Sequence, residues 1–178
     1  MAVPTWEAIR SRRNVRAYTD VPLSGDHLDE ILEAGRRAPS SQNWQPWDFV
    51  VVTSRPALVS LSEVQGRGGS EHVASAAAAV GVVAQVLDGS GSEGSERRLY
   101  FDLGQAVMSM MLAAAGLKIG SCHAGVSDQD LARRVLGLPD DRFCAYVISF
   151  GYPADRELTL IRYPARRAFD EVVHRDHW

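Results

Sequence analysis

The feature that most constrains the fold is the apolar segment at residues 97–116, which is long enough for about five turns of helix. From residue 99 it reads LYFDLGQAVMSMMLAAAG, and at about 3.6 residues per turn its large apolar side chains point around most of the circumference. These side chains are Leu99, Phe101, Leu103, Val107, Met108, Met110, Met111 and Leu112. Such a helix must be buried by more than one neighbour. In a chain of 178 residues, a second copy of the chain is a natural source of one neighbour.

The rest of the chain predicts short strands interleaved with helices. β-branched and small apolar runs place strands at 48–53, 76–86 and 144–150. Further helices are expected from Ser24 to Pro39, over 56–64, and from a capping box at Ser127 to Gly137, with loops at 66–70 and 88–96. Neither a repeat nor a linker divides the sequence, so it predicts one α+β domain over 1–178.

Composition and charge exclude several classes of protein. The net charge of −3 gives no overall attraction to nucleic acid, so we expect no nucleic-acid partner. The run at 99–117 carries Asp102, Gln105 and Ser109, which is unlike a membrane span, and the N-terminus lacks the apolar region of a signal peptide. The two cysteines have no CxxC spacing, which argues against zinc or a disulfide framework. We therefore expect a cytoplasmic protein.

Two arginine clusters lie near opposite ends of the sequence. SRRNVRAY occupies 11–18, and YPARR occupies 163–167. The planar guanidinium fork matches phosphate, so the two clusters could bind one phosphate if the fold brings the chain ends together. For the first cluster, a solvated helix end with basic residues at the C-terminal dipole is an equal alternative.

A polar and aromatic segment, APSSQNWQPWDFV, lies between an expected helix and an expected strand at 38–50. A plain connection needs residues that suit turn angles, and it does not need several amide and hydroxyl side chains beside two tryptophans. Trp47 directly precedes the strand and is expected in the core. The clustered polar side chains require partners of their own, so the segment predicts contact with something planar and polar.

The glycine-rich segment GLKIGSCHAG at 116–125 could bring bare backbone N–H groups close to a ligand, although such a turn is often only a helix cap. Cys122 and His123 do not predict a nucleophile–base pair, because neighbours in an extended segment point to opposite sides. His174 and His177 are interpreted as part of a frayed tail rather than as a metal site. Phosphate and ring recognition without an acid–base pair is typical of a protein whose cofactor does the chemistry.

The motifs IRSRRNVRAY, APSSQNWQPWDFVVV, a glycine-rich GSCHAG, a strand ending in GYP and a late RR occur in this order over about residues 5–173. Together they resemble the nitroreductase family of FMN-dependent oxidoreductases, in particular its compact bacterial members. The resemblance implies a three-layer α+β fold with a mixed, mostly antiparallel sheet flanked by helices. It also implies an intertwined homodimer with two FMN molecules at the subunit interface.

The resemblance further implies roles for individual residues, with no catalytic side chain and no metal. Phosphate, ribityl or pyrimidine contacts would come from Arg12, Arg13, Asn14, Arg16, Arg166 and Arg167. The flavin of the other subunit would be reached by Ser40, Ser41 and Asn43. The N5/O4 side of the ring would face a loop made of Gly120, Ser121, His123, Ala124 and Gly125. Trp44 would act as a substrate lid. The chain departs from the family pattern at Asn14, at the extra Lys118 and Ile119, and at His123.

The implied activity is transfer of hydride from NADH or NADPH, through flavin N5, to a small-molecule acceptor in a ping-pong mechanism. Nitroaromatics, quinones and enones are the candidate acceptors. One alternative is a non-catalytic flavin-binding or flavin-storage protein. The other is a relative that fragments flavin or dehalogenates aromatic substrates, although residues 62–75 are short for the lid that dehalogenation needs.

Overall fold

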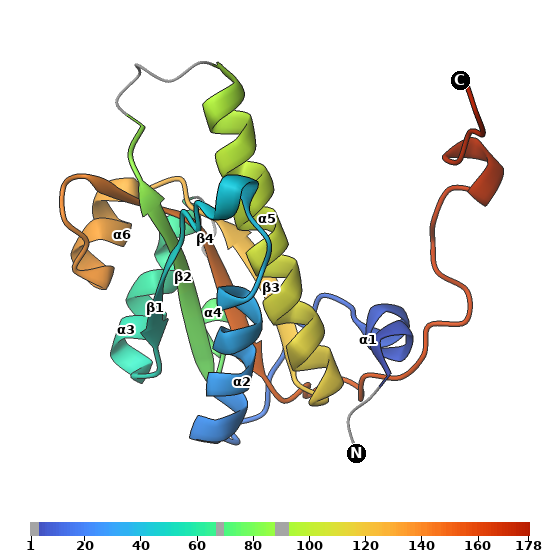
Figure 1. The fold of residues 1–178 in the computed structure, drawn as a ribbon. Helices are drawn as coiled ribbons and strands as arrows, with labels where there is room; N and C mark the ends of the chain where they lie inside the picture. Colours follow the sequence, from blue (N-terminus) through green and yellow to red (C-terminus); the bar gives the residue numbers. More distant parts are fainter. Residues whose placement is uncertain (1–3, 67–69, 88–92) are drawn as a thin grey trace.

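The computed structural model describes residues 4–66, 70–87 and 93–178, and it has the expected α+β architecture in three layers (Figure 1). In chain order the elements are α1 (Thr5–Ser11), α2 (Gly25–Arg36), the 3-10 turn η1 (Ser41–Asn43), β1 (Asp48–Val52), α3 (Arg55–Ser62), η2 (Glu63–Gln65), α4 (Glu71–Ala74), β2 (Ala78–Gln85), α5 (Glu93–Gly116), β3 (Gly120–Gly125), α6 (Gln129–Leu136), β4 (Arg142–Gly151) and η3 (Phe169–Glu171). Within the described residues the sheet has the strand order β1-β2-β4-β3, and every strand pairing is antiparallel. A single bridge between Asn14 and Ser121 supplies a parallel contact.

Helix α5 lies across one face of the sheet, with α2 beside it (Figure 1). Leu103 and Met110 of α5 are fully buried against side chains of β2 and β4, including Val80 and Phe150. Burial of each such side chain contributes about 1.5–3 kcal/mol. The other side of α5 is open: Phe101 is 69% exposed and Met108 is 44% exposed. The expected all-round apolar helix is therefore buried on one side only within a single chain.

The opposite face of the sheet is covered by α3, α4 and α6. Leu58 and Leu61 of α3 and Leu136 of α6 pack against Val147 of β4 and neighbouring strand residues. Helices on both faces of an antiparallel sheet make the three layers that the resemblance implied.

Three details of the sequence prediction need correction. The loop expected at 88–96 lies partly outside the described residues, but residues 93–96 belong to α5, where the acidic Glu96 suits the positive end of the helix dipole. The cap of α6 is Asp128 rather than Ser127, because Asp128 Oδ1 accepts the Leu131 N–H at 2.8 Å. The glycine-rich segment 120–125 is not a loop but strand β3, since it pairs residue for residue with β4. By contrast, Ser24 caps α2 as expected, and Gly137 ends α6 in a left-handed conformation.

Helix α1 and the C-terminal arm, residues 153–178, lie to one side of the sheet. Ala8 of α1 and Leu158 of the arm belong to one buried cluster with Ala115 near the C-terminal end of α5. Val15, Tyr18 and Ala76 complete this cluster. Beyond this contact the arm runs past α1 and projects away from the body of the molecule (Figure 1). All residues from 162 to 178 are exposed.

The N-terminal segment reaches the sheet where β3 carries a glycine. A Cβ atom added at Gly120 would lie 2.7–2.9 Å from three side-chain atoms of Val15, which is closer than carbon atoms tolerate. Val15 N donates to the Ser121 carbonyl at 3.0 Å, so the backbone position is also fixed. Gly120 is therefore needed for the segment after α1 to lie against β3.

We expect Gly120→Ala to reduce the free energy of unfolding by about 1–3 kcal/mol, because the stiff Val15 side chain must move. The measurement is urea unfolding followed by circular dichroism. Gly125→Ala is the matched control in the same strand, since nothing lies within 4 Å of its added Cβ atom. Equal losses in the two variants would contradict the proposed contact.

Candidate functional site

Arg12 caps the C-terminal end of α1 and is half-buried against α5. One guanidinium nitrogen donates to Asn14 Oδ1 at 3.1 Å and lies 3.7 Å from Met111 Sδ. Its Nε atom is buried and has no hydrogen-bond partner among the described residues. A buried N–H without a partner is unfavourable, so this side chain is suited to donate a hydrogen bond to an acceptor atom of a ligand.

Arg166 of the arm brings a second positive charge to Arg12. Burial lowers the pKa of Arg12, the nearby Cys122 thiol opposes this effect, and the charge of Arg166 lowers the pKa further. In the part of the chain that the structure describes, neither arginine forms an ion pair. Two guanidinium groups that repel one another, and that form no ion pair with a described carboxylate, are suited to bind an anion. The structure therefore brings together one member of each sequence cluster.

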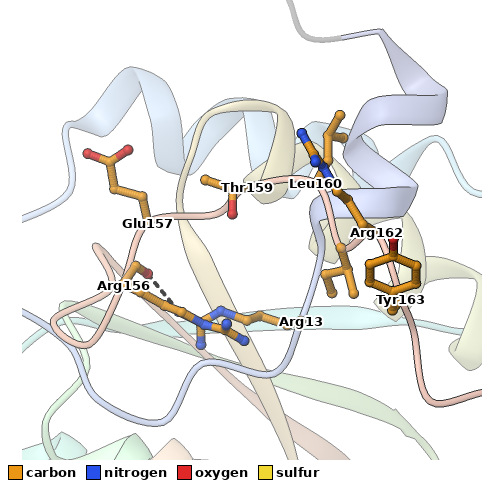
Figure 2. A pocket seen from close by; sticks show the side chains of 8 residues that line it. Arg13, Arg156, Glu157, Thr159, Leu160, Arg162 and Tyr163 are labelled. Carbon is orange, nitrogen blue, oxygen red and sulfur yellow. Dashed lines mark hydrogen bonds between the residues drawn. The ribbon is translucent and has the colours of Figure 1, made fainter.

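Arg13 and Arg167 have protein partners instead. Arg13 pairs with Asp155 at 2.7 Å and donates to the Arg156 carbonyl at 2.6 Å, beside a cavity of about 310 Å³ under the arm (Figure 2). Arg167 donates to the Glu171 carbonyl at 2.7 Å. Arg13 thus holds the base of the arm against the body. Cofactor contacts by Arg13 and Arg167 stay predictions.

Strand β3 is an edge strand whose outer side faces the segment after α1. Because the Ser121 carbonyl accepts from Val15 on this side, strand alternation turns the backbone N–H groups of His123 and Gly125 to the same outer side. Gly120 and Ala124 direct their backbone groups toward β4. Strand β3 therefore presents a row of backbone N–H donors next to Arg12. Pairing with β4 fixes the positions of these donors.

A cavity of about 370 Å³ lies at this edge of the sheet. It is lined by Arg16, Gln65, Ser70, Glu71, His72, Cys122 and His123. The sequence analysis identified Arg16 and His123 as site residues but missed His72. This histidine lies in a short helix in which no motif stands out, and its neighbours in the cavity come from distant parts of the chain. Only the folded arrangement could have revealed it.

Cys122 lies within the electrostatic influence of both Arg12 and Arg16. Burial raises the pKa of its thiol, and the two arginines oppose this effect only in part. A neutral thiol is a poor nucleophile. His123 is exposed, whereas Cys122 is buried, as expected for neighbours on opposite faces of a strand. Both findings agree with the expectation that no Cys–His pair acts here.

The polar turn at residues 40–45 is held by specific hydrogen bonds. Ser41 N donates at 3.0 Å to Asp102 Oδ2, a carboxylate almost fully buried on α5, and Gln45 N donates to Ser40 Oγ at 2.9 Å. Gln42, Asn43 and Gln45 all have positive φ, between 52° and 57°. Such strain persists only where the surrounding contacts impose it, and it is concentrated at functional sites.

This turn lies far from Arg12 in the same chain. Ser41 contacts Asp102, and Arg12 contacts Met111, so the two sites are about 14 Å apart along α5 at a rise of about 1.5 Å per residue. Figure 1 shows the turn beside the upper half of α5 and α1 beside its lower end. We call Arg12 and Arg166 together the arginine site. Within one chain, Ser40, Ser41 and Asn43 of the turn therefore lie too far along α5 to reach the arginine site.

The two tryptophans of the turn have different environments. Trp47 is 8% exposed and belongs to the main core, as the sequence predicted. Trp44 is 46% exposed and lines a separate cavity of about 250 Å³ with Trp47 and Arg142. Its role as a lid stays a prediction. Among the described helices, none combines the length and apolar character needed to cross a membrane.

Comparison with known proteins gives consistent matches over nearly the whole chain. Residues 9–152 match the model of the Nitroreductase family. A protein of Archaeoglobus fulgidus, named as a candidate NADH dehydrogenase/NAD(P)H nitroreductase, is 34% identical over 175 residues, covering 96% of each chain. The NADH dehydrogenase of Thermus thermophilus is 29% identical, covering 90% of this chain and 92% of its own. The FMN-dependent nitroreductase of Clostridium difficile has a similar structure, with a TM-score of 0.82, 25% identity and coverage of 97% and 99%.

The buried histidine of the cavity predicts a dependence of stability on pH. Burial lowers the pKa of His72 below its ordinary 6.5, and the charges of Arg16 and His123 add to this effect. The unfolded chain therefore binds this proton more tightly than the folded protein, and stability is lost as pH falls below about 6.5. We expect the melting temperature to fall from pH 7 to pH 5, and to fall less in His72→Asn. His27→Asn, a control on α2, should keep the wild-type dependence, and an unchanged dependence in His72→Asn would refute the assignment.

Proposed function

This chain belongs to the nitroreductase family, and we propose that it is an FMN-dependent oxidoreductase that uses NADH or NADPH as electron donor. The observation that carries the proposal is the half-buried Arg12 beside the open edge of β3, with the charge of the exposed Arg166 acting on it. Within the described residues neither arginine forms an ion pair. The names of the relatives support the proposal, because they include NAD(P)H nitroreductases and an FMN-dependent nitroreductase.

The residues present fit FMN. Its phosphate is a dianion, and the unpartnered Nε of Arg12 together with the charge of Arg166 offers donors for it. Its ring has carbonyl and nitrogen acceptors along one edge, and the outward N–H groups of His123 and Gly125 offer donors for them. Arg16 lines the cavity together with Cys122 and would contact the ring or ribityl chain.

We propose a homodimer in which each site uses residues of both subunits. The exposed apolar side of α5, with Phe101 and Met108, supports a subunit contact. The arm supports a second one, since Tyr163 is 94% exposed and Trp178 is 98% exposed. In such a dimer, the strained turn with Ser41 and Asn43 would reach the arginine site of the other copy, which one chain does not do.

The residues of the chain then have distinct tasks in the proposed reaction. FMN, when bound, would accept hydride at N5 from NADH or NADPH and pass it to a nitroaromatic, quinone or enone. Arg12 and Arg166 would bind its phosphate, and the edge of β3 would orient the ring and stabilise negative charge on it by preorganised N–H groups. Trp44 would cover the acceptor, and no side chain need act as an acid. Two free cysteines are compatible with the proposed cytoplasmic location.

The direct test is the visible absorbance spectrum of the protein after incubation with FMN and desalting, followed by anaerobic addition of NADH or NADPH. Retained flavin that is bleached by either nucleotide is the expected result. Retained flavin that neither nucleotide reduces would point to a flavin-binding or flavin-modifying protein. Loss of all flavin on desalting would overturn the cofactor assignment.

Arg12→Gln should weaken FMN binding by about 10- to 100-fold, because a hydrogen bond to a charged group contributes about 1.5–3 kcal/mol. Quenching of FMN fluorescence on titration with protein measures the affinity. Arg36→Gln is the matched control, because Arg36 lies on the outer surface of α2 and pairs with Glu33 at 2.6 Å. An affinity loss of the same size in the control would contradict a specific phosphate site.

The shared site can be tested with mixed dimers. Homodimers of Arg12→Gln and homodimers of a Ser41→Ala/Asn43→Ala variant should both bind FMN weakly. A heterodimer of the two variants would contain one intact site and one doubly altered site. We therefore expect about half of the wild-type flavin content after refolding and separation by two affinity tags. Binding no better than in the parent variants would show that the arginines and the turn act within one chain.

A further inference from the structure

A buried carboxylate on α5 holds the polar turn at residues 40–45. Asp102 is 1% exposed, and its Oδ2 atom accepts the Ser41 N–H at 3.0 Å. Its Oδ1 atom accepts a hydrogen bond from the Gln105 side-chain amide at 3.3 Å. Both partners are N–H donors, so both carboxylate oxygens act as acceptors. Among the described residues no cation pairs with Asp102, so no ion pair offsets the burial of this carboxylate.

Gln105 connects the same carboxylate to the start of the turn. Its Nε2 atom donates to the Pro39 carbonyl at 3.2 Å as well as to Asp102. Because both neighbours of this group are acceptors, the nitrogen of the amide must face them. Residues 39 and 41 are therefore each tied to α5 by one hydrogen bond. We call Asp102 and Gln105 together the α5 clamp.

The α5 clamp binds the backbone of the turn and leaves two of its polar side chains available. Among the described residues neither Ser41 Oγ nor the Asn43 side-chain amide has a hydrogen-bond partner. Ser40 Oγ, by contrast, accepts the Gln45 N–H within the turn at 2.9 Å. Asn43 has a φ of 57°, which is uncommon outside glycine and persists where other contacts impose it. The turn is thus fixed in a strained shape that presents Ser41 and Asn43 to a ligand.

Position 102 requires a carboxylate, because both of its partners donate. An Asn side chain has nearly the same shape, but it offers one acceptor oxygen and one NH₂ donor. Rotation of the Gln105 amide would restore its contact with Asn, but it would turn the Gln105 oxygen toward the Pro39 carbonyl. Asn therefore loses at least one of the three hydrogen bonds that hold the turn. A buried polar group without its partner is unfavourable, so the turn would separate from α5.

The position of Gln105 links the α5 clamp to the exposed side of the helix. Phe101, Gln105 and Met108 have the spacing i, i+4 and i+7, so they share one face of α5. This face is the proposed subunit contact. Association of two copies would therefore cover the α5 clamp and exclude water from its hydrogen bonds, which strengthens them.

We propose that Asp102 and Gln105 are positioning residues for cofactor binding, which set the geometry of Ser41 and Asn43 without touching the cofactor themselves. This inference rests on the proposed function, in which Ser41 and Asn43 reach the FMN of the other copy. Asp102 then acts on flavin binding only through the turn.

A double-mutant cycle tests whether Asp102 acts through the turn. Asp102→Asn should weaken FMN binding about 10-fold, roughly the value of one hydrogen bond, as measured by quenching of FMN fluorescence. In the Ser41→Ala/Asn43→Ala background the same substitution should change the affinity less than about twofold, because the contacts that it positions are already absent. Equal weakening in both backgrounds would show a general structural loss and would overturn the proposal.

Ser109→Ala is the control on the same helix. Ser109 Oγ donates to the Gln105 carbonyl at 2.8 Å and contacts no residue of the turn. We expect its FMN affinity to match that of the wild-type protein. A loss as large as that of Asp102→Asn would mean that any polar change on this side of α5 weakens binding, which contradicts a specific role for the α5 clamp.

A second measurement does not depend on flavin. In the FMN-free protein the Ser41 amide should exchange its hydrogen slowly, although the turn lies at the surface, because the N–H is bonded to a buried carboxylate. Asp102→Asn should accelerate this exchange about 10-fold, with exchange in β2 unchanged. Gln105→Ala keeps the carboxylate and should give a smaller acceleration, so it provides the answer if Asp102→Asn does not fold. Fast exchange of Ser41 in the wild-type protein would refute the α5 clamp.

The two proposals fail in different ways. If the wild-type protein binds no FMN, the proposed function and this inference both fail. If it binds FMN and the cycle shows equal losses in both backgrounds, only the inference fails.

Discussion

The packing of α5 on the sheet is the constraint on which the rest of the structure depends. Leu103 and Met110 fix the helix on β2 and β4. The same helix holds the strained polar turn through the buried Asp102, and it supports Arg12 through Met111. Because α5 is rigid, the distance between the turn and the arginine is also fixed. In the proposed dimer, the exposed side of α5 would contact the second copy, and the turn of one copy would reach the arginines of the other.

Electrostatic pairing separates the arginines into two groups. Arg13 is paired with Asp155 and holds the arm, whereas Arg12 and Arg166 repel each other beside a buried thiol. The Arg13–Asp155 ion pair holds the base of the arm. The arm in turn carries Arg166, whose charge acts on Arg12. Arg13 makes the stabilising ion pair, and the adjacent Arg12 makes the proposed contact with the phosphate. Neighbouring residues can have these two roles because successive side chains after the end of α1 point in different directions.

Much of the fold could be predicted from the sequence, since periodicity and capping residues are local signals. The run at 144–150, the Ser24 cap and the Gly137 terminus appear where the sequence places them. The glycine-rich 120–125 segment was wrongly predicted to be a loop, because its strand conformation comes from pairing with β4 rather than from its own propensity. For the site, the arginines and the polar turn were identified, and their cofactor contacts stay predictions. His72 was missed because its partner Ser149 lies far away in the sequence.

By itself the sequence determined the residue types of the site: guanidinium groups for an anion, a polar turn beside Trp47, and a helix with apolar side chains on most sides. These properties follow from composition and spacing, which do not depend on how the chain folds. Only the tertiary structure decided which of the described arginines form ion pairs, which strand edge is open, and that His72 joins His123 in lining the cavity. Those outcomes depend on contacts between residues far apart in the chain, because burial and pairing are set by the neighbours that folding supplies.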